Sequence, residues 1–330
     1  MNNQVTYKDL CLKHPEIPIF MQYWWIDVAS KGNWDVIYAK NNDEIIGFFV
    51  FSYQKKFGKT IITNHPLTQY SGPFIFYPTG LNTSEVHSLE NKVYTSIIEQ
   101  LESKNIDFIE INCHYSFKNW QQFFWSGYKQ TTKYTYVLKN ISNKEYLLKE
   151  MSYSQRRRKI KNNKTDYKLS LELSAEEFYD FYKNNLSLQG KNIFYSKEYF
   201  LSLYNASKNR NQGQILSLYN TENELVSAFW VIWDKESAYH MILTQYKNKK
   251  CSESTTLLVW KTIDFLKDKT QNYDFEGSMI KNVAINNQYY GAEAVPYHSI
   301  SKSNSLIMSA WKKYQEFKSQ ANIKKTSLKK

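Results

Sequence analysis

The feature that most constrains the fold is a pattern of elements that occurs twice along the chain. A turn leading into an apolar strand is expected at residues 43–51, and the pattern returns at 224–232, about 180 residues later. Each strand is followed by an amphipathic helix, expected at 84–104 and again at 254–269. Alternating strands and helices predict mixed sheets with helices on their faces.

Both expected helices run into a further strand, at 106–111 in the first half and at 273–277 in the second. A short helix, a glycine and a tyrosine-rich strand then follow in each half, the last of these at 134–138 and 296–300. The order of elements agrees over roughly 100 residues. We therefore expect an α/β (α+β) protein of two tandem units, each with a mixed central sheet flanked by helices.

The chain has 330 residues, which is long for a single hydrophobic core. Helices are expected between the two copies, at 143–163, 175–188 and 197–207. The expected divisions are an N-terminal unit (1–140), a C-terminal unit with a basic opening helix (141–310) and a basic tail (311–330).

Composition excludes several classes of protein. An apolar content of 42% and an aromatic content of 17% are enough for packed cores, so global disorder is not expected. Three cysteines without paired spacing favour a reducing compartment. The chain has no basic-then-apolar leader and no apolar run of about 18 residues, so we expect a cytoplasmic protein without a transmembrane segment. His and Cys spacings typical of metal ligands are absent, so no metal is expected.

The net charge of +12 is concentrated in two segments. Residues 151–168 and 311–330 each hold seven basic residues and one acidic residue, so each carries a net charge of +6. The end of the second segment, 323–330, is expected to be a frayed, solvated terminus. In the first segment Arg157 and Lys161 share one helix face. It is either a solvated basic helix or one that contacts a phosphate group, to which guanidinium is well suited.

Two carboxylates lie late in the second half. Asp274 and Glu276 are two apart in the expected strand, so their side chains are expected on the same side of the sheet. Buried there without partners, they would destabilise the fold. Either they are structural groups bonded to backbone and basic residues, or they line a cleft in which Glu276 acts as a base or holds an amine. Gly277 would let a ligand approach the backbone.

Several motifs, taken in order, resemble a known family and together span nearly the whole chain. They are Pro-Ile-Phe-Met-Gln-Tyr-Trp-Trp (18–25), Pro-Leu-Thr-Gln-Tyr-Ser-Gly-Pro (66–73), Gln-Arg-Arg-Arg-Lys-Ile (155–160), Asp-Phe-Glu-Gly-Ser-Met (274–279), and Gly291-Ala292 followed by Pro296-Tyr297. This set resembles the FemAB-like N-acyltransferases of the GNAT superfamily. The resemblance implies two GNAT-like domains side by side and transfer of an acyl group to an amine. One departure is the loop at 247–253, where the pyrophosphate loop of the family carries glycine and this chain has none.

Acyl transfer to an amine needs a base, donors for the oxyanion and an acid for the leaving group. The loop before the helix at 254 either holds the pyrophosphate of acyl-CoA or is a plain surface loop. The stretch 67–73 is by composition a turn, and by the resemblance lies near the acceptor. The expected site residues are Glu276, Asp274 and Tyr297 for catalysis, Lys249, Lys250, Ser252, Ser254 and Arg157 for acyl-CoA, and Gln69, Tyr70, Gly72 and Arg156 for the acceptor.

The leading hypothesis is an acyltransferase that moves an acyl group from acetyl-CoA or another acyl-CoA to an amine of a sugar or cell-envelope precursor, as in polysaccharide biosynthesis. The resemblance alone supplies this acceptor class. One alternative is an aminoacyl-tRNA-dependent transferase of the peptidoglycan type, which makes tRNA a less favoured partner. The other is a non-catalytic protein that binds glycans or nucleotides. DNA is not an expected partner.

Overall fold

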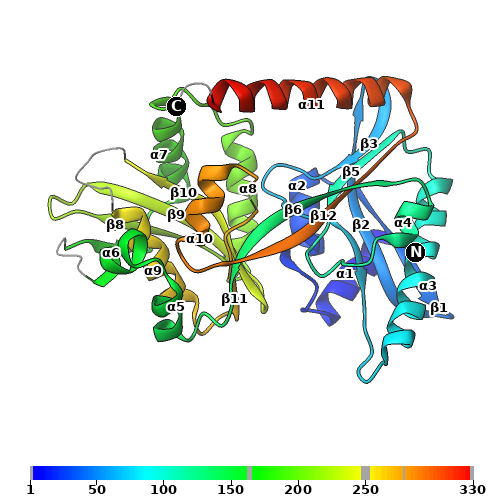
Figure 1. The fold of residues 1–330 in the computed structure, drawn as a ribbon, viewed down its shortest axis with the longest axis horizontal. Coiled ribbons are helices and arrows are strands. Elements are labelled where there is room, and N and C mark those ends of the chain that lie inside the picture. Colours follow the sequence, from blue (N-terminus) through cyan, green and yellow to red (C-terminus); the bar gives the residue numbers. More distant parts are fainter. Residues whose placement is uncertain (1–2, 162–165, 247–252, 278, 328–330) are drawn as a thin grey trace.

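The computed structural model describes residues 3–161, 166–246, 253–277 and 279–327. Within them, one mixed sheet extends through both halves of the chain, and helices flank it (Figure 1). This confirms the α/β (α+β) class. In spatial order the strands are β1 (Trp34–Asn41), β2 (Glu44–Lys56), β3 (Lys59–Thr63), β5 (Phe108–Asn112), β12 (Glu293–Ser303), β6 (Lys129–Leu138), β11 (Asn272–Asp274), β10 (Ser237–Gln245), β9 (Leu225–Trp233), β8 (Gly213–Tyr219) and β7 (Lys168–Ser170), with β4 (Gly72–Ile75) paired to β2.

Most of the helices expected from the sequence begin and end close to the expected positions, because the signals that start them are local in sequence. Asn82 and Glu85 form a capping box at the start of α3, and Ser174 and Glu177 form another at α7. The helices are α1 (Asn3–Lys13), the 3-10 helix η1 (Ile19–Met21), α2 (Tyr23–Ser30), α3 (Thr83–Ser103), α4 (Gln121–Trp125), α5 (Lys144–Glu150), the π-helix η2 (Tyr153–Arg157), α6 (Arg158–Lys161), α7 (Ala175–Ser187), α8 (Lys197–Lys208), α9 (Ser254–Leu266), α10 (Lys281–Gln288) and α11 (Leu306–Ser327).

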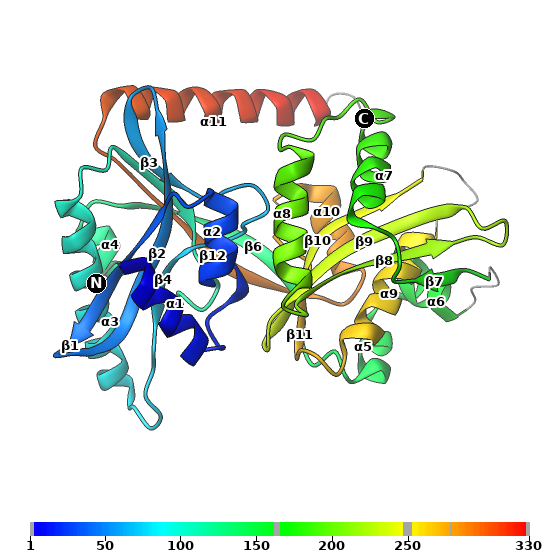
Figure 2. The same cartoon turned by 180° about the vertical axis from the view of Figure 1, so that it is seen from behind.

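The last strands of the two halves are exchanged, as Figure 2 shows from behind. β6 leaves the first half and pairs with β11, where Asp274 lies opposite Val137. β12 returns from the second half to pair with β5, where Ser299 lies opposite Asn112. β12 and β6 also pair with each other, so the two halves share one sheet. The division into two tandem units near residue 140 stays a prediction, since these strands cross it.

A shared hydrophobic core also joins the halves. The ring of Trp25, from α2, stacks on Trp230 of β9 with centroids 6.3 Å apart. Phe20 packs edge-on against Tyr70 at 4.9 Å and against Tyr239 of β10 at 5.1 Å. Aromatic pairs of this kind add about 0.5–1.5 kcal/mol each beyond the area they bury. Side chains far apart in sequence therefore fix how the halves meet.

Two expectations about helices are wrong. The helix expected at 143–163 is broken into α5, η2 and α6, because the chain turns after Glu150 and the Ser152 N–H donates to the Tyr289 carbonyl. The frayed terminus expected from residue 323 is helical as far as Ser327, since it continues α11. No helix in the described part of the chain is long and apolar enough to cross a membrane.

Candidate functional site

The sheet opens where β10 and β11 part. The two strands pair in parallel over three residues only, from Ser237 with Asn272 to Tyr239 with Asp274. β10 continues beyond this point with an irregularity between His240 and Ile242. The expectation of a strand at 273–277 is therefore wrong beyond Asp274. The opening lies at the centre of the sheet, beside β6.

A hydrogen-bonded turn ends β11 and places Glu276. The backbone N–H of Glu276 donates to Asp274 Oδ1 at 2.8 Å, and the N–H of Phe275 donates to the Tyr136 carbonyl at 2.9 Å. Glu276 has φ = 59°, in the left-handed region that residues other than glycine rarely adopt. Backbone strain of this kind is concentrated at functional sites. Asp274 and Glu276 therefore line the same cavity because of this turn, and not because alternate residues of a strand share a face.

Both carboxylates line a small cavity to which both halves contribute. Its volume is about 20 Å³, which is room for about one water molecule. Asp274 accepts a short hydrogen bond from the Thr135 hydroxyl. Glu276 is partly exposed as a residue, yet both its carboxylate oxygens are buried and have no hydrogen-bond partner among the described residues. The lining residues are Gln69, Tyr70, Cys113, Tyr115, Thr135, Asp274, Glu276, Gly277 and Tyr297.

Burial dominates the electrostatics of this cavity. Burial raises the pKa of Asp274 to about 6, although the hydrogen bonds from the Thr135 hydroxyl and the Glu276 N–H act to lower it. Burial and then the charge of Asp274 raise the pKa of Glu276 well above its ordinary value. Burial and the two neighbouring carboxylates also raise the pKa of Tyr297 to about 12. The cavity therefore holds two carboxyl groups that keep their protons to higher pH than ordinary carboxyl groups do.

A chain of buried hydrogen bonds runs from the cavity into the second half. The hydroxyl of Tyr70 donates to that of Tyr239 at 2.9 Å, and Tyr239 donates to Asp234 Oδ2 at 3.0 Å. Asp234 also accepts from the backbone N–H groups of Ile19, at 3.1 Å, and Ser237, at 2.8 Å. Because Tyr70 donates its proton into this chain, its hydroxyl oxygen can act only as an acceptor toward any further group.

We expect Asp234→Ala to destabilise the protein by about 3 kcal/mol or more, because it leaves several buried donors without an acceptor. The change is measured as the free energy of unfolding in urea. Asp180→Ala is the control, since Asp180 forms an exposed ion pair with Lys197 and should cost about 0.5 kcal/mol or less. A cost for Asp234→Ala as small as that of the control would show that the buried chain does not hold the halves together.

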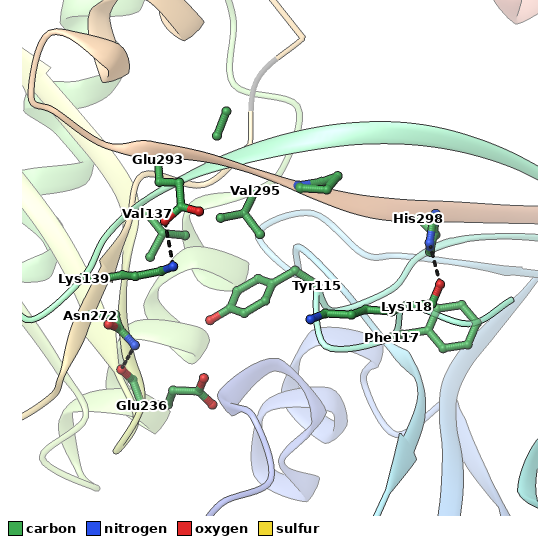
Figure 3. Close-up of a pocket in the computed structure, with 12 residues that line it drawn as sticks. Tyr115, Phe117, Lys118, Val137, Lys139, Glu236, Asn272, Glu293, Val295 and His298 are labelled. Carbon is green, nitrogen blue, oxygen red and sulfur yellow. Dashed lines mark hydrogen bonds and ion pairs between the residues drawn. The ribbon is translucent and has the colours of Figure 1, made fainter. Parts of the chain in front are cut away.

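A larger pocket of about 580 Å³ adjoins the cavity, and Tyr115 lines both. Val137 and Val295 form an apolar wall, and Lys139 pairs with Glu293 at 2.7 Å (Figure 3). Val137 and Val295 lie on the same face of the sheet as Asp274, because β6 pairs residue by residue with β11 and β12.

Two charged groups in this pocket carry no counter-charge. Glu236 and Lys118, both exposed, form no ion pair among the described residues, and both line the pocket (Figure 3). Burial and the charge of Asp234 raise the pKa of Glu236. The pocket therefore offers a carboxylate and an ammonium group beside an apolar wall.

The structure separates the predicted acceptor residues into two places. Gln69 and Tyr70 line the small cavity. Gly72 is just behind it, where a Cβ atom would lie 2.9 Å from Ile111 Cδ1. Arg156 does not join them, since its guanidinium lies 4.6 Å from the centre of the Tyr290 ring and donates to Asn286 Oδ1 at 3.0 Å.

Of the residues predicted to bind acyl-CoA, Lys249, Lys250 and Ser252 lie outside the described residues. Ser254 is buried at the first position of α9, and its hydroxyl has no partner among the described residues. Arg157 lies over the Tyr153 ring at 5.0 Å. Tyr290, over whose ring the Arg156 guanidinium lies, also forms a hydrogen bond with Thr256 in the first turn of α9. The arginines therefore gather on the α9 side of the sheet.

Sequence reasoning missed several cavity residues, namely Tyr115, Thr135 and Cys113. Thr135 carried a usable signal, because it alternates with Lys133 and Val137 on one face of a strand. Tyr115 and Cys113 follow β5 and reach the cavity only through tertiary packing. No group of three or more His, Cys, Asp or Glu in the part of the chain described here could hold a metal ion.

No protein-family model matches the chain, and no curated protein matches it in sequence. Solved structures do match its fold. FemX has a TM-score of 0.67 at 10% identity, covering 90% of this chain and 96% of its own. The chain has a FemAB-like fold. This confirms the fold that the resemblance implied.

Two further structures are similar. A domain assigned as the C-terminal part of a lysylphosphatidylglycerol synthetase from Agrobacterium fabrum has a TM-score of 0.54 at 7% identity, covering 93% of this chain and 94% of its own. A conserved protein of unknown function from Bacteroides thetaiotaomicron has a TM-score of 0.54 at 9% identity, covering 83% and 90%. At these identities the likeness concerns the fold alone.

Proposed function

We propose that the protein is an acyltransferase that acts on an amine at the cavity between β10 and β11. The observation that carries this proposal is Glu276, whose buried carboxylate has no partner among the described residues and is held by a strained backbone turn. A buried carboxylate without a partner destabilises a fold, so its presence calls for a role. It points to the functional interpretation of this carboxylate in preference to the structural one.

Glu276 suits the role of general base. An acceptor amine is protonated in water, with a pKa of roughly 10, and must lose a proton before it attacks an acyl carbonyl. The raised pKa of Glu276 makes it a stronger base than an ordinary carboxylate. Asp274 is the positioning residue in this scheme, because it accepts hydrogen bonds from Thr135 and from the Glu276 N–H and so fixes the turn.

The remaining steps draw on groups around the same opening. Glu276 takes a proton from the ammonium group, and the free amine then attacks the acyl carbon. As the bond to the donor breaks, the departing thiolate or alkoxide takes a proton from the hydroxyl of Tyr297, and the new amide nitrogen gives its excess proton to the Tyr297 oxygen. The oxyanion donor is expected from the backbone of β10 at its irregularity, opposite the end of β11. Gly277 leaves space for this geometry, because a Cβ atom there would lie 2.9 Å from the Tyr297 ring.

The two sides of the sheet suit different substrates. The larger pocket adjoins the cavity on the Asp274 side and would take the acceptor. The side of α9, with Arg156 and the start of the helix, would take the phosphates of the donor. Donor and acceptor would then meet at the opening from opposite faces. We place the site in the C-terminal half, with an amine of a sugar or cell-envelope precursor as acceptor and acetyl-CoA or another acyl-CoA as donor.

One observation favours the aminoacyl-tRNA alternative for the donor. The arginine-rich helical stretch lies beside α9, and the loop before α9 lacks the glycines that usually bind the pyrophosphate of CoA. A tRNA end presents phosphates to arginine equally well. The donor is therefore the first property to test.

Thermal-shift titration tests the donor. With millimolar acetyl-CoA we expect the melting temperature to rise, because ligand binding to the folded state stabilises it by mass action. We expect Arg156→Ala to lose most of the shift, with Arg210→Ala as the matched control, since Arg210 stacks on Trp24 away from the site. A shift absent at millimolar acetyl-CoA would count against acyl-CoA. Salt-sensitive binding of bulk tRNA, lost in Arg157→Ala, would establish the alternative.

A further inference from the structure

Helix α11 lies along one edge of the molecule and carries an apolar face without a partner. Figures 1 and 2 show it spanning from the first half toward α7, with no other drawn element on its outer side. Its inner side is anchored, because Met308 is buried against Ile61 and Phe108 and Trp311 packs with them. The outer side is therefore the surface to explain.

Large apolar side chains are exposed on that outer side. Leu306 is 90% exposed, Phe317 72%, Tyr314 61% and Ile307 55%. Their spacing puts them within one stripe of a helix, opposite Met308. We call these four residues the α11 stripe. An exposed apolar stripe of this kind on a soluble fold marks an interaction site.

A further exposed aromatic ring lies at the neighbouring hairpin. Phe57, 64% exposed, is in the turn between β2 and β3. The ammonium of Lys56 lies 3.9 Å from the centre of the Trp311 ring, so this turn lies against α11. The apolar surface is thus wider than one helix.

The charge around the stripe is positive. The nearby carboxylates are neutralised, since Asp107 pairs with Lys59 at 3.1 Å and Glu110 pairs with Lys312. Lys55, Lys56 and Lys313 form no ion pair with any side chain that the structure describes. The sequence from residue 311 onward adds seven lysines against one glutamate. An apolar stripe flanked by lysines has the composition of a helix that lies on an anionic membrane surface.

We propose that the α11 stripe and its lysines bind the protein to the surface of an anionic lipid bilayer. Aliphatic Leu306 and Ile307 gain free energy by entering the acyl boundary, whereas they gain none on phosphates or bases, and α11 contains no arginine. A second copy of the chain would bring the same positive charges together, so self-association through this face is opposed by repulsion. The inference goes beyond the proposed chemistry and stands independently of it.

Sedimentation with vesicles tests the proposal. The full chain should bind vesicles with about one third phosphatidylglycerol, bind pure phosphatidylcholine far less, and release as salt is raised. Leu306→Gln with Phe317→Gln should weaken binding at least about tenfold, and so should Lys55→Glu with Lys313→Glu. The matched control is Phe194→Gln with Trp125→Gln, whose side chains are 81% and 66% exposed elsewhere.

All three double variants should keep the wild-type melting temperature, because every changed side chain is exposed or borders solvent. The proposal is overturned if the wild type does not bind the anionic vesicles at low salt, or if the stripe variant binds as tightly as the control. It is also overturned if the stripe variant binds vesicles normally but loses RNA binding or a concentration-dependent dimer.

Discussion

Glu276→Gln is expected to lower kcat of acyl transfer by about 100- to 10,000-fold, because the amide keeps the shape of the side chain and cannot accept the proton of the amine. The assay follows CoA release, or aminoacyl-tRNA consumption, over a panel of amines. In the wild type, kcat/KM should rise with pH through the raised pKa of Glu276, and the variant should lose that dependence.

Glu90→Gln is the matched control for this loss. Glu90 is also nearly buried, at 9% exposure, but lies on α3 with its carboxylate satisfied by Tyr77 at 3.0 Å and Asn119 at 2.9 Å. Its variant should keep the wild-type kcat. If Glu276→Gln retained full transfer to an identified acceptor, another group would be the base.

The class of the fold could be predicted from the sequence because its signals are local. Capping boxes and apolar periodicity place α3 and α7, and both depend on residues within a few positions of each other. The exchange of β6 and β12 could not be predicted in this way. The alternating, tyrosine-rich sequences of β6 and β12 would fit equally well beside β5 or beside β11. Only tertiary packing therefore decides which of these strands pair.

The site could be predicted in part for the same reason. Asp274 and Glu276 are close in sequence, and their shared cavity follows from a turn of three residues. Tyr115 and Thr135 reach that cavity from other strands and loops. Arg156 was grouped with the acceptor residues by motif alone, but its contacts with Tyr290 and Asn286 place it on the α9 side of the sheet. Contacts between residues on different strands cannot be recognised from the spacing of residues within one segment of the sequence.

The stability of the protein should depend on pH through the same carboxylates, with a sign opposite to that of ordinary salt-bridged acids. In the unfolded chain Asp and Glu ionise near pH 4, whereas burial raises the folded pKa of Asp274 to about 6 and raises that of Glu276 well above its ordinary value. Between these values the folded state binds more protons than the unfolded state. The free energy of unfolding therefore falls as pH rises, by up to about 1.4 kcal/mol per pH unit for each group.

Glu276→Gln isolates the contribution of Glu276, because all other ionisable groups remain. The variant and the wild type should have similar stability at about pH 3, below the unfolded pKa, where the carboxyl is protonated in both the folded and the unfolded states. The variant should become progressively more stable than the wild type as pH rises through the unfolded pKa, and the difference should stop growing once pH passes the raised folded pKa of Glu276. Urea unfolding at a series of pH values measures this difference in the free energy of unfolding.

A variant that is less stable than the wild type at neutral pH would show that a neighbouring group stabilises the Glu276 carboxylate. Glu276 would then lack the raised pKa proposed for the base. A gain in stability coupled to a loss of activity would instead mark Glu276 as a residue kept for chemistry at the expense of the fold.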